Sequence, residues 1–138
     1  MSVVEKLVLT VPANKRHLGL VGAVVTEICA QLPKLPSTFA YNLQLAIDEA
    51  IVNVITHAYQ DDPEGRVELT FEIWEDRLIT HIQDWGQSFD PSSVPEPDLD
   101  HPQDHGYGVY LIRSLSDQVI YEPGPSSNRV TIVKLLPA

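Results

Sequence analysis

The sequence contains a single cysteine, Cys29, among its 138 residues. One thiol cannot form an internal disulfide framework or a zinc site that needs several cysteines. Basic residues are also scarce, because nine Lys and Arg stand against 19 Asp and Glu, which gives a net charge of −10. This balance argues against direct binding to nucleic acid or to an anionic membrane surface, since both require a positive field. A small anionic ligand is still compatible with it if backbone N–H groups and a cation hold that ligand.

Long apolar runs are absent as well. No stretch reaches the length of a membrane span, and Met1 to Lys15 lacks the basic start and apolar core of a signal peptide. We therefore expect a cytoplasmic protein without a membrane segment. The length of 138 residues, with 43% hydrophobic and 20% charged residues, indicates one globular domain over residues 1–138.

The hydrophobic pattern changes its period several times along the chain. Alternating apolar residues predict strands, and apolar residues spaced three and four apart predict helices. The expected strands cover residues 5–12, 66–74, 78–83, 118–122 and 129–136, and the expected helices cover residues 15–31, 42–59 and 107–116. This order favours an α+β fold: a two-layer α/β sandwich with a mainly antiparallel mixed sheet and helices on one face.

The helix expected at residues 42–59 carries the first candidate functional residues. It has no Gly, Pro, Lys or Arg, and Glu49, Asn53 and His57 are spaced four apart, so that their side chains leave one face. A solvated helix face normally carries cations and ion pairs, so this polar stripe is predicted to line a cleft. The alternative is a buried helix whose Glu and Asn side chains cap a neighbouring loop.

Two further stretches have the character of the same site. Asp84-Trp85-Gly86 follows a strand, and Gly106 and Gly108 flank the start of a helix, where backbone N–H groups and the helix dipole attract a phosphate. Residues 84–107 have no periodicity and hold four prolines, which is typical of a functional lid or a disordered segment. Taken singly, the glycines and Asp84 are equally typical of turns. Their combination around a long lid favours a phosphate site.

Three motifs in this order resemble the nucleotide-binding boxes of the GHKL ATPases, the superfamily of gyrases, chaperones, histidine kinases and mismatch-repair proteins. Asp48-Glu49-Ala50-x-x-Asn53-x-x-x-His57-Ala58-Tyr59 resembles the N box, Asp84-x-Gly86-x-x-Phe89-Asp90 the first glycine box, and Gly106-x-Gly108-Val109-x-Leu111-Ile112-Arg113 the second. Within these boxes the chain is most similar to the small anti-sigma factor serine/threonine kinases of bacterial partner-switching systems. The similarity runs from Leu7 to Leu136 and implies a fold of the GHKL (Bergerat) type.

The resemblance implies roles for the residues around the phosphates. Asn53 would hold Mg²⁺ between the nucleotide phosphates, and Glu49 would be the catalytic general base for the attacking hydroxyl. Gly106 and Gly108 would cradle the phosphates, and residues 90–105 would form the lid. ATP and Mg²⁺ are therefore the expected cofactors.

Five other matching positions are expected to bind the nucleotide. Asp84 would accept a hydrogen bond from the adenine amino group, Gly86 would let the base lie against the backbone, and Thr131 would reach the adenine from the sheet. His57 would face phosphate or only favour the helix dipole. Arg113 would contact phosphate or a protein partner, or stand in solvent.

By resemblance, the chain is expected to be a Mg²⁺/ATP-dependent protein serine/threonine kinase. It would phosphorylate a small antagonist protein of the anti-anti-sigma type, would sequester a sigma factor or another regulator, and would form a homodimer. Two alternatives remain: a non-catalytic, nucleotide-gated protein-binding module of the same fold, and a slow ATPase without a protein acceptor. One departure from the family pattern is Gln87-Ser88, which replaces a second glycine and would stiffen the start of the lid.

Overall fold

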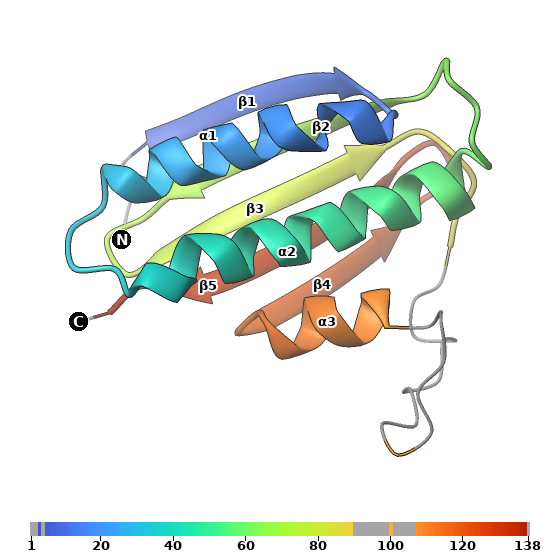
Figure 1. The fold of residues 1–138 in the computed structure, drawn as a ribbon. Coiled ribbons are helices and arrows are strands. Elements are labelled where there is room, and N and C mark those ends of the chain that lie inside the picture. The colour runs from blue at the N-terminus through green and yellow to red at the C-terminus, as the bar shows by residue number, and fades with distance from the viewer. Residues whose placement is uncertain (1–2, 4, 90–99, 101–106, 138) are drawn as a thin grey trace.

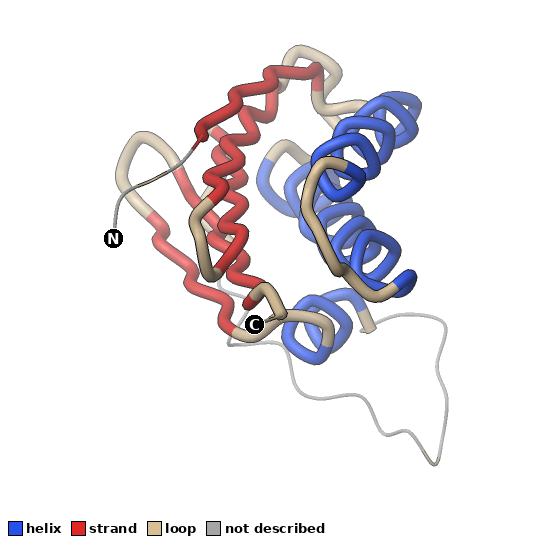
Figure 2. The backbone as a smooth tube through the Cα atoms, turned by 90° about the vertical axis from the view of Figure 1, so that its left-hand side faces the viewer, coloured by secondary structure: helices blue, strands red, loops and turns tan. Residues whose placement is uncertain are grey.

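The computed structural model describes residues 3, 5–89, 100 and 107–137 of the chain. Within these residues, five strands and three α-helices form two layers, with the helices on one face of the sheet (Figures 1 and 2). The strands are β1 (Glu5–Pro12), β2 (Arg66–Ile73), β3 (Arg77–Asp84), β4 (Gln118–Pro123) and β5 (Asn128–Leu135), and the helices are α1 (Leu18–Ala30), α2 (Ser37–Asn53) and α3 (Gly108–Ser114). In this part of the chain no helix has the length and apolar character needed to cross a membrane.

The sheet has the strand order β1-β2-β3-β5-β4, and every neighbouring pair in it is antiparallel. The predicted α+β sandwich is confirmed, but the mixed sheet is not observed among the described strands. Two helices, α1 and α2, connect β1 to β2 and so return the chain in the antiparallel direction. A single described helix, α3, lies between β3 and β4, which run parallel to each other. They do not pair, because β5 lies between them.

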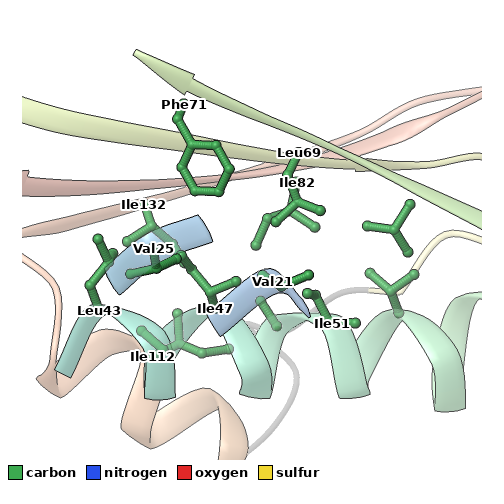
Figure 3. Packing of buried hydrophobic residues seen from close by; sticks show 14 of the residues in the cluster. Val21, Val25, Leu43, Ile47, Ile51, Leu69, Phe71, Ile82, Ile112 and Ile132 are labelled. Atoms are coloured by element: carbon green, nitrogen blue, oxygen red, sulfur yellow. The ribbon is translucent and has the colours of Figure 1, made fainter. Parts of the chain in front are cut away.

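The core fills the space between the sheet and the helices (Figure 3). Every second residue of β2, from Val67 to Ile73, points to the helices and is at most 7% exposed. The sheet contributes Leu69, Phe71, Ile82 and Ile132, and the helices contribute Val21, Val25, Leu43, Ile47, Ile51 and Ile112. The apolar side chains that alternate along the strands therefore pack against those spaced three and four apart on α2, and together they form one apolar layer.

The end of α2 differs from the prediction of one helix over residues 42–59. The α-helix ends at Asn53, and a π-helical turn, Val54–Ala58, follows it. In this wider turn the N–H of Tyr59 donates to the carbonyl of Val54 at 3.0 Å. The carbonyl of Ala58 accepts from the N–H of Gln87 at 2.7 Å instead. The turn therefore attaches the end of α2 to the segment that follows β3, and such π-helical turns are frequent at functional sites.

Candidate active site

A cavity of about 450 Å³, including its open mouth, lies at the end of the sheet where β3 ends and β5 begins. Apolar side chains form most of its walls, and a few polar groups stand among them. Its lining consists of Ala50, Asn53, Val54, Ala58, Asp84, Gln87, Phe89, Ile112, Tyr121, Glu122, Pro123, Asn128, Arg129 and Val130. This composition is typical of a pocket for a small organic ligand, since apolar walls bind it and a few polar groups orient it.

Glu49, Asn53 and Gly108 meet beside this cavity. A β-carbon at Gly108 would lie 3.0 Å from Oε2 of Glu49 and 3.5 Å from Oδ1 of Asn53. The side chains of α2 therefore reach the first residue of α3, so the N box and the second glycine box adjoin in space. Only a glycine leaves the space above these two side chains open, which is what a ligand group placed there requires.

Asp84, the last residue of β3, is 3% exposed and lines the cavity. Its Oδ1 accepts from the N–H of Gly86 at 3.0 Å and from Nδ2 of Asn128 at 2.9 Å. Oδ2 makes no hydrogen bond within the described ranges. An ionised carboxylate only accepts hydrogen bonds, so this oxygen suits a donor on a ligand, such as an exocyclic amino group.

Gly86 packs against the end of α2. A β-carbon there would collide with the carbonyl oxygen of Ala58 and would lie 2.6 Å from its carbon. The need for glycine thus comes from the close approach of two backbones, in addition to the closeness to a base that the resemblance implied. The adjacent Gln87 N–H uses the same carbonyl.

Thr131 requires a correction, because the structure places it on the face of the sheet away from the helices. It lies opposite His81 in the β3–β5 ladder, and its Oγ1 is 2.9 Å from Nδ1 of that histidine. His81 in turn bonds Glu72 through Nε2 at 2.9 Å. Side chains alternate between the faces of a strand, so Val130 lines the cavity and Thr131 does not.

His57 and Arg113 do not line the cavity either. His57 is exposed, and its ring stacks on Phe89 with 4.4 Å between the ring centroids and 13° between the planes. The π-turn explains this position, because it changes the rotation per residue after Asn53 and moves His57 out of the four-residue spacing. Arg113 is exposed on α3, and its charge acts on the phenol of Tyr121.

Part of the predicted site falls outside the described residues. Gly106, the box residue Asp90 and the proposed lid at residues 90–105, apart from Asp100, belong to that part of the chain. The start of the lid segment is described. Gln87 and Ser88, which replace a glycine there, both form side-chain hydrogen bonds. Gln87 accepts from Nε2 of Gln60 at 3.2 Å, and Ser88 Oγ donates to Asn128 Oδ1 at 3.0 Å.

The structure also adds two site residues that the sequence analysis missed, Asn128 and Tyr121. Asn128 faces Asp84 across the β3–β5 ladder, and Tyr121 lies opposite Val130 on the cavity side of β4. The hydroxyl of Tyr121 is buried without a hydrogen-bond partner in the described part of the chain, and burial raises the pKa of Tyr121. Strand register was the signal needed to find both residues, and sequence alternation alone does not supply it.

The side chains near Asn53 suit Mg²⁺ better than a metal ion whose ligands all come from the protein. Among the described residues there is no cluster of three or more His, Cys, Asp or Glu that could hold a metal ion. Mg²⁺ commonly takes one or two protein oxygens and completes its shell with water and phosphate oxygens. The carboxamide oxygen of Asn53 and the open space at Gly108 suit that arrangement.

Asp48, next to Glu49, is a second carboxylate near the site, but it lies on another flank of α2. Gln44, one turn earlier, contacts α1, where a β-carbon at Gly22 would lie 2.7 Å from Cδ of Gln44. Oδ1 of Asp48 is buried and lacks a partner within the described residues. Burial, with a smaller contribution from the charge of Glu49, raises the pKa of Asp48 to about 6.

Asp48→Asn is expected to raise the free energy of unfolding at pH 8 by about 1 kcal/mol, because it removes a charge whose ionisation is costly at this partly buried position; solvent screening lowers that cost. The folded-state pKa lies above the unfolded value of 3.8, so the charge destabilises the fold fully above pH 6. This penalty disappears as the pH falls below 3.8, where both states are protonated. Urea unfolding at pH 8 and pH 4 measures it, and an equal gain at both pH values would contradict the explanation.

Comparison with known proteins agrees with this geometry. A model of the histidine kinase-like ATPase domain matches residues 11–134. The serine-protein kinase RsbW of Oceanobacillus iheyensis is 29% identical over 131 residues, which cover 86% of this chain and 80% of that protein. RsbW of Bacillus subtilis is 29% identical over 119 residues, with 80% and 74% covered.

Two solved structures share the fold. The structure of the RsbU and RsbW domains of Rv1364c from Mycobacterium tuberculosis superposes with a TM-score of 0.70 at 18% identity, covering 98% of this chain and 34% of that one. The histidine kinase domain of the blue-light activated kinase of Erythrobacter litoralis EL346 gives 0.58 at 19% identity, with 90% and 61% covered. The family match extends over nearly the whole chain and includes the N box and the described residues of both glycine boxes. The chain belongs to the histidine kinase-like ATPase domain family.

Proposed function

We propose that the chain is a Mg²⁺- and ATP-dependent protein serine/threonine kinase whose acceptor is a small antagonist protein. The observation that carries this proposal is the meeting of Glu49, Asn53 and Gly108 beside an apolar cavity. The similarity to proteins named serine-protein kinases supports it, because that similarity extends over most of both chains. Residues 1–138 would act as one catalytic unit.

The chemistry of the proposal is the transfer of the γ-phosphoryl group to a Ser or Thr hydroxyl. The bond from the γ-phosphorus to the bridging oxygen of ATP breaks, a bond to the acceptor oxygen forms, and ADP leaves. Glu49 takes the hydroxyl proton. Asn53 would hold Mg²⁺ through its carboxamide oxygen, and the ion would supply neutralisation of the phosphate charge.

The cavity supports an adenine nucleotide as the phosphoryl donor. Its apolar walls, among them Val54, Ile112 and Val130, suit a flat ring. Asp84, which lines the cavity, offers an acceptor to the amino group of adenine. Tyr121 also lines the cavity, and its buried hydroxyl has no hydrogen-bond partner among the described residues.

Partner exchange is part of the proposal. The chain would work in the cytoplasm as a homodimer, and would hold a sigma factor or another regulator until an anti-anti-sigma-type antagonist displaces it. The exposed face of α1 supports such contacts, because Leu20 is 51% exposed there. The net charge of −10 favours partners with basic surfaces, since complementary charge speeds encounter.

Asn53→Ala is expected to weaken Mg²⁺-dependent ATP binding by about tenfold or more, a loss typical when support of a metal site is removed. Calorimetric titration with ATP and ADP, with and without Mg²⁺, measures this. Asn42→Ala is the matched control, because it removes a carboxamide about three turns earlier on the same helix. Wild-type protein that binds neither nucleotide would rule out both the kinase and the ATPase, and would leave only a protein-binding module.

A further inference from the structure

Asn128 connects three parts of the site. It lies opposite Asp84 in the β3–β5 ladder, and its Nδ2 donates to Oδ1 of Asp84 at 2.9 Å and to the carbonyl of Gly86 at 3.1 Å. Its Oδ1 accepts from Oγ of Ser88 at 3.0 Å and from the N–H of Gly124 at 3.4 Å. One side chain therefore joins the end of β3, the segment that follows it and the β4–β5 turn.

These contacts determine how Asp84 faces the cavity. Oδ1 of Asp84 accepts two hydrogen bonds, from Asn128 and from the N–H of Gly86, so the plane of its carboxylate is held. Oδ2 is left as the acceptor available to a ligand. A carboxylate oxygen accepts hydrogen bonds and has no proton to donate. The pocket thus presents an acceptor at this point and no donor.

We propose that Asn128 is the positioning residue that makes this site select a purine with an amino group at position 6, acting through Asp84. The inference rests on the proposed function, and it adds the basis of nucleotide selection. Adenine has an amino donor at position 6, whereas guanine and hypoxanthine have a carbonyl there. A carbonyl facing Oδ2 would leave two buried acceptors unpaired, and a site built for a donor rejects such an analogue strongly.

The carboxamide suits this role because it donates and accepts at once. Its NH₂ group binds Asp84 and Gly86 while its oxygen binds Ser88 and Gly124. Alanine would remove one of the two donors to Oδ1. Aspartate would keep the size and place a second carboxylate beside the first, and two such groups cannot both be ionised. The shared proton would then provide an O–H donor in the pocket.

The test compares the dissociation constants of ATP and ITP between pH 6 and pH 7.5. The two nucleotides differ at position 6 of the purine and in the N1 proton of hypoxanthine, which stays bound over this pH range. We expect the wild type to prefer ATP by about tenfold or more, the effect of one paired group. Asn128→Ala should lower this preference mainly through weaker ATP binding. Asn128→Asp should lower it further at low pH, because protonation of the pair favours ITP. A purely structural role would weaken both nucleotides equally and give no pH dependence of the ratio.

Thr131→Val is the matched control, since it changes the same strand on the opposite face, and its ATP/ITP ratio should equal that of the wild type. An unchanged ratio in both Asn128 variants, or a wild type without preference, would overturn the role of Asn128 and leave nucleotide binding intact. A wild type that binds neither nucleotide would overturn the proposed function itself.

Discussion

Glu49→Gln is expected to lower the rate of phosphoryl transfer by about 10²–10⁴-fold, the usual contribution of a positioned general base. Glutamine has nearly the size of glutamate and still accepts hydrogen bonds, but it does not take up a proton at neutral pH. Adenine would bind in the cavity that Asp84 lines, whereas Oε2 of Glu49 lies beside Gly108, outside the contacts proposed for adenine. ATP affinity is therefore expected to stay nearly unchanged.

The measurement follows labelled γ-phosphate from ATP into Ser and Thr residues of a heat-treated host lysate, with ATP binding measured in parallel. Asp48→Asn is the control, because it removes the adjacent negative charge from another flank of α2 and should keep transfer. Transfer at the wild-type rate by Glu49→Gln would show that another group is the base. If the wild type transfers no phosphate but exchanges partners in response to nucleotide, the chain is a nucleotide-gated binding module.

Gly86→Ala is expected to destabilise the fold by about 1–3 kcal/mol, the usual cost of extra volume at a packed position. The new methyl group would meet the backbone of Ala58, which cannot rotate away as a side chain can. Separating the two segments would break the hydrogen bond from the N–H of Gln87 to that carbonyl. Asp84 would move with them, because it accepts from the N–H of Gly86, so ATP affinity should fall by about tenfold or more.

Gly19→Ala serves as the matched control, since a β-carbon at Gly19 would have no atom within 4 Å. This glycine lies in α1, where alanine is the better helix former, so the variant should gain about 1 kcal/mol. Thermal unfolding and calorimetric ATP titration of both variants give the comparison. Wild-type stability and affinity in Gly86→Ala would mean that the contact with Ala58 relaxes without cost.

The fold was readable from the sequence because local patterns agree with the tertiary arrangement. β2 alternates strictly between buried and partly exposed residues, and α2 keeps its apolar residues at helical spacing. The sequence of each element therefore indicates which of its faces is buried. Glu49 and Asn53 were predictable as a pair for the same reason, since a spacing of four in an α-helix places side chains on one face.

The position of Thr131 was not predictable in this way. β5 has apolar residues on both faces, Val130 and Ile132 toward the helices and Val133 away from them, so alternation does not identify the face of the cavity. The register against β3 decides it, and this register brings Asn128 to Asp84 and Thr131 to His81. Register depends on partners far apart in sequence and on the burial of a whole strand.

By itself, the sequence determined the family, the order of the elements and the pairing of Glu49 with Asn53, because local spacing and motif order contain that information. The tertiary structure alone decided which side chains complete the site. The π-turn after Asn53 moves His57 onto Phe89 and turns the carbonyl of Ala58 toward Gln87. These outcomes arise from competition among backbone hydrogen bonds of segments distant in sequence, and the residues of one segment do not specify them.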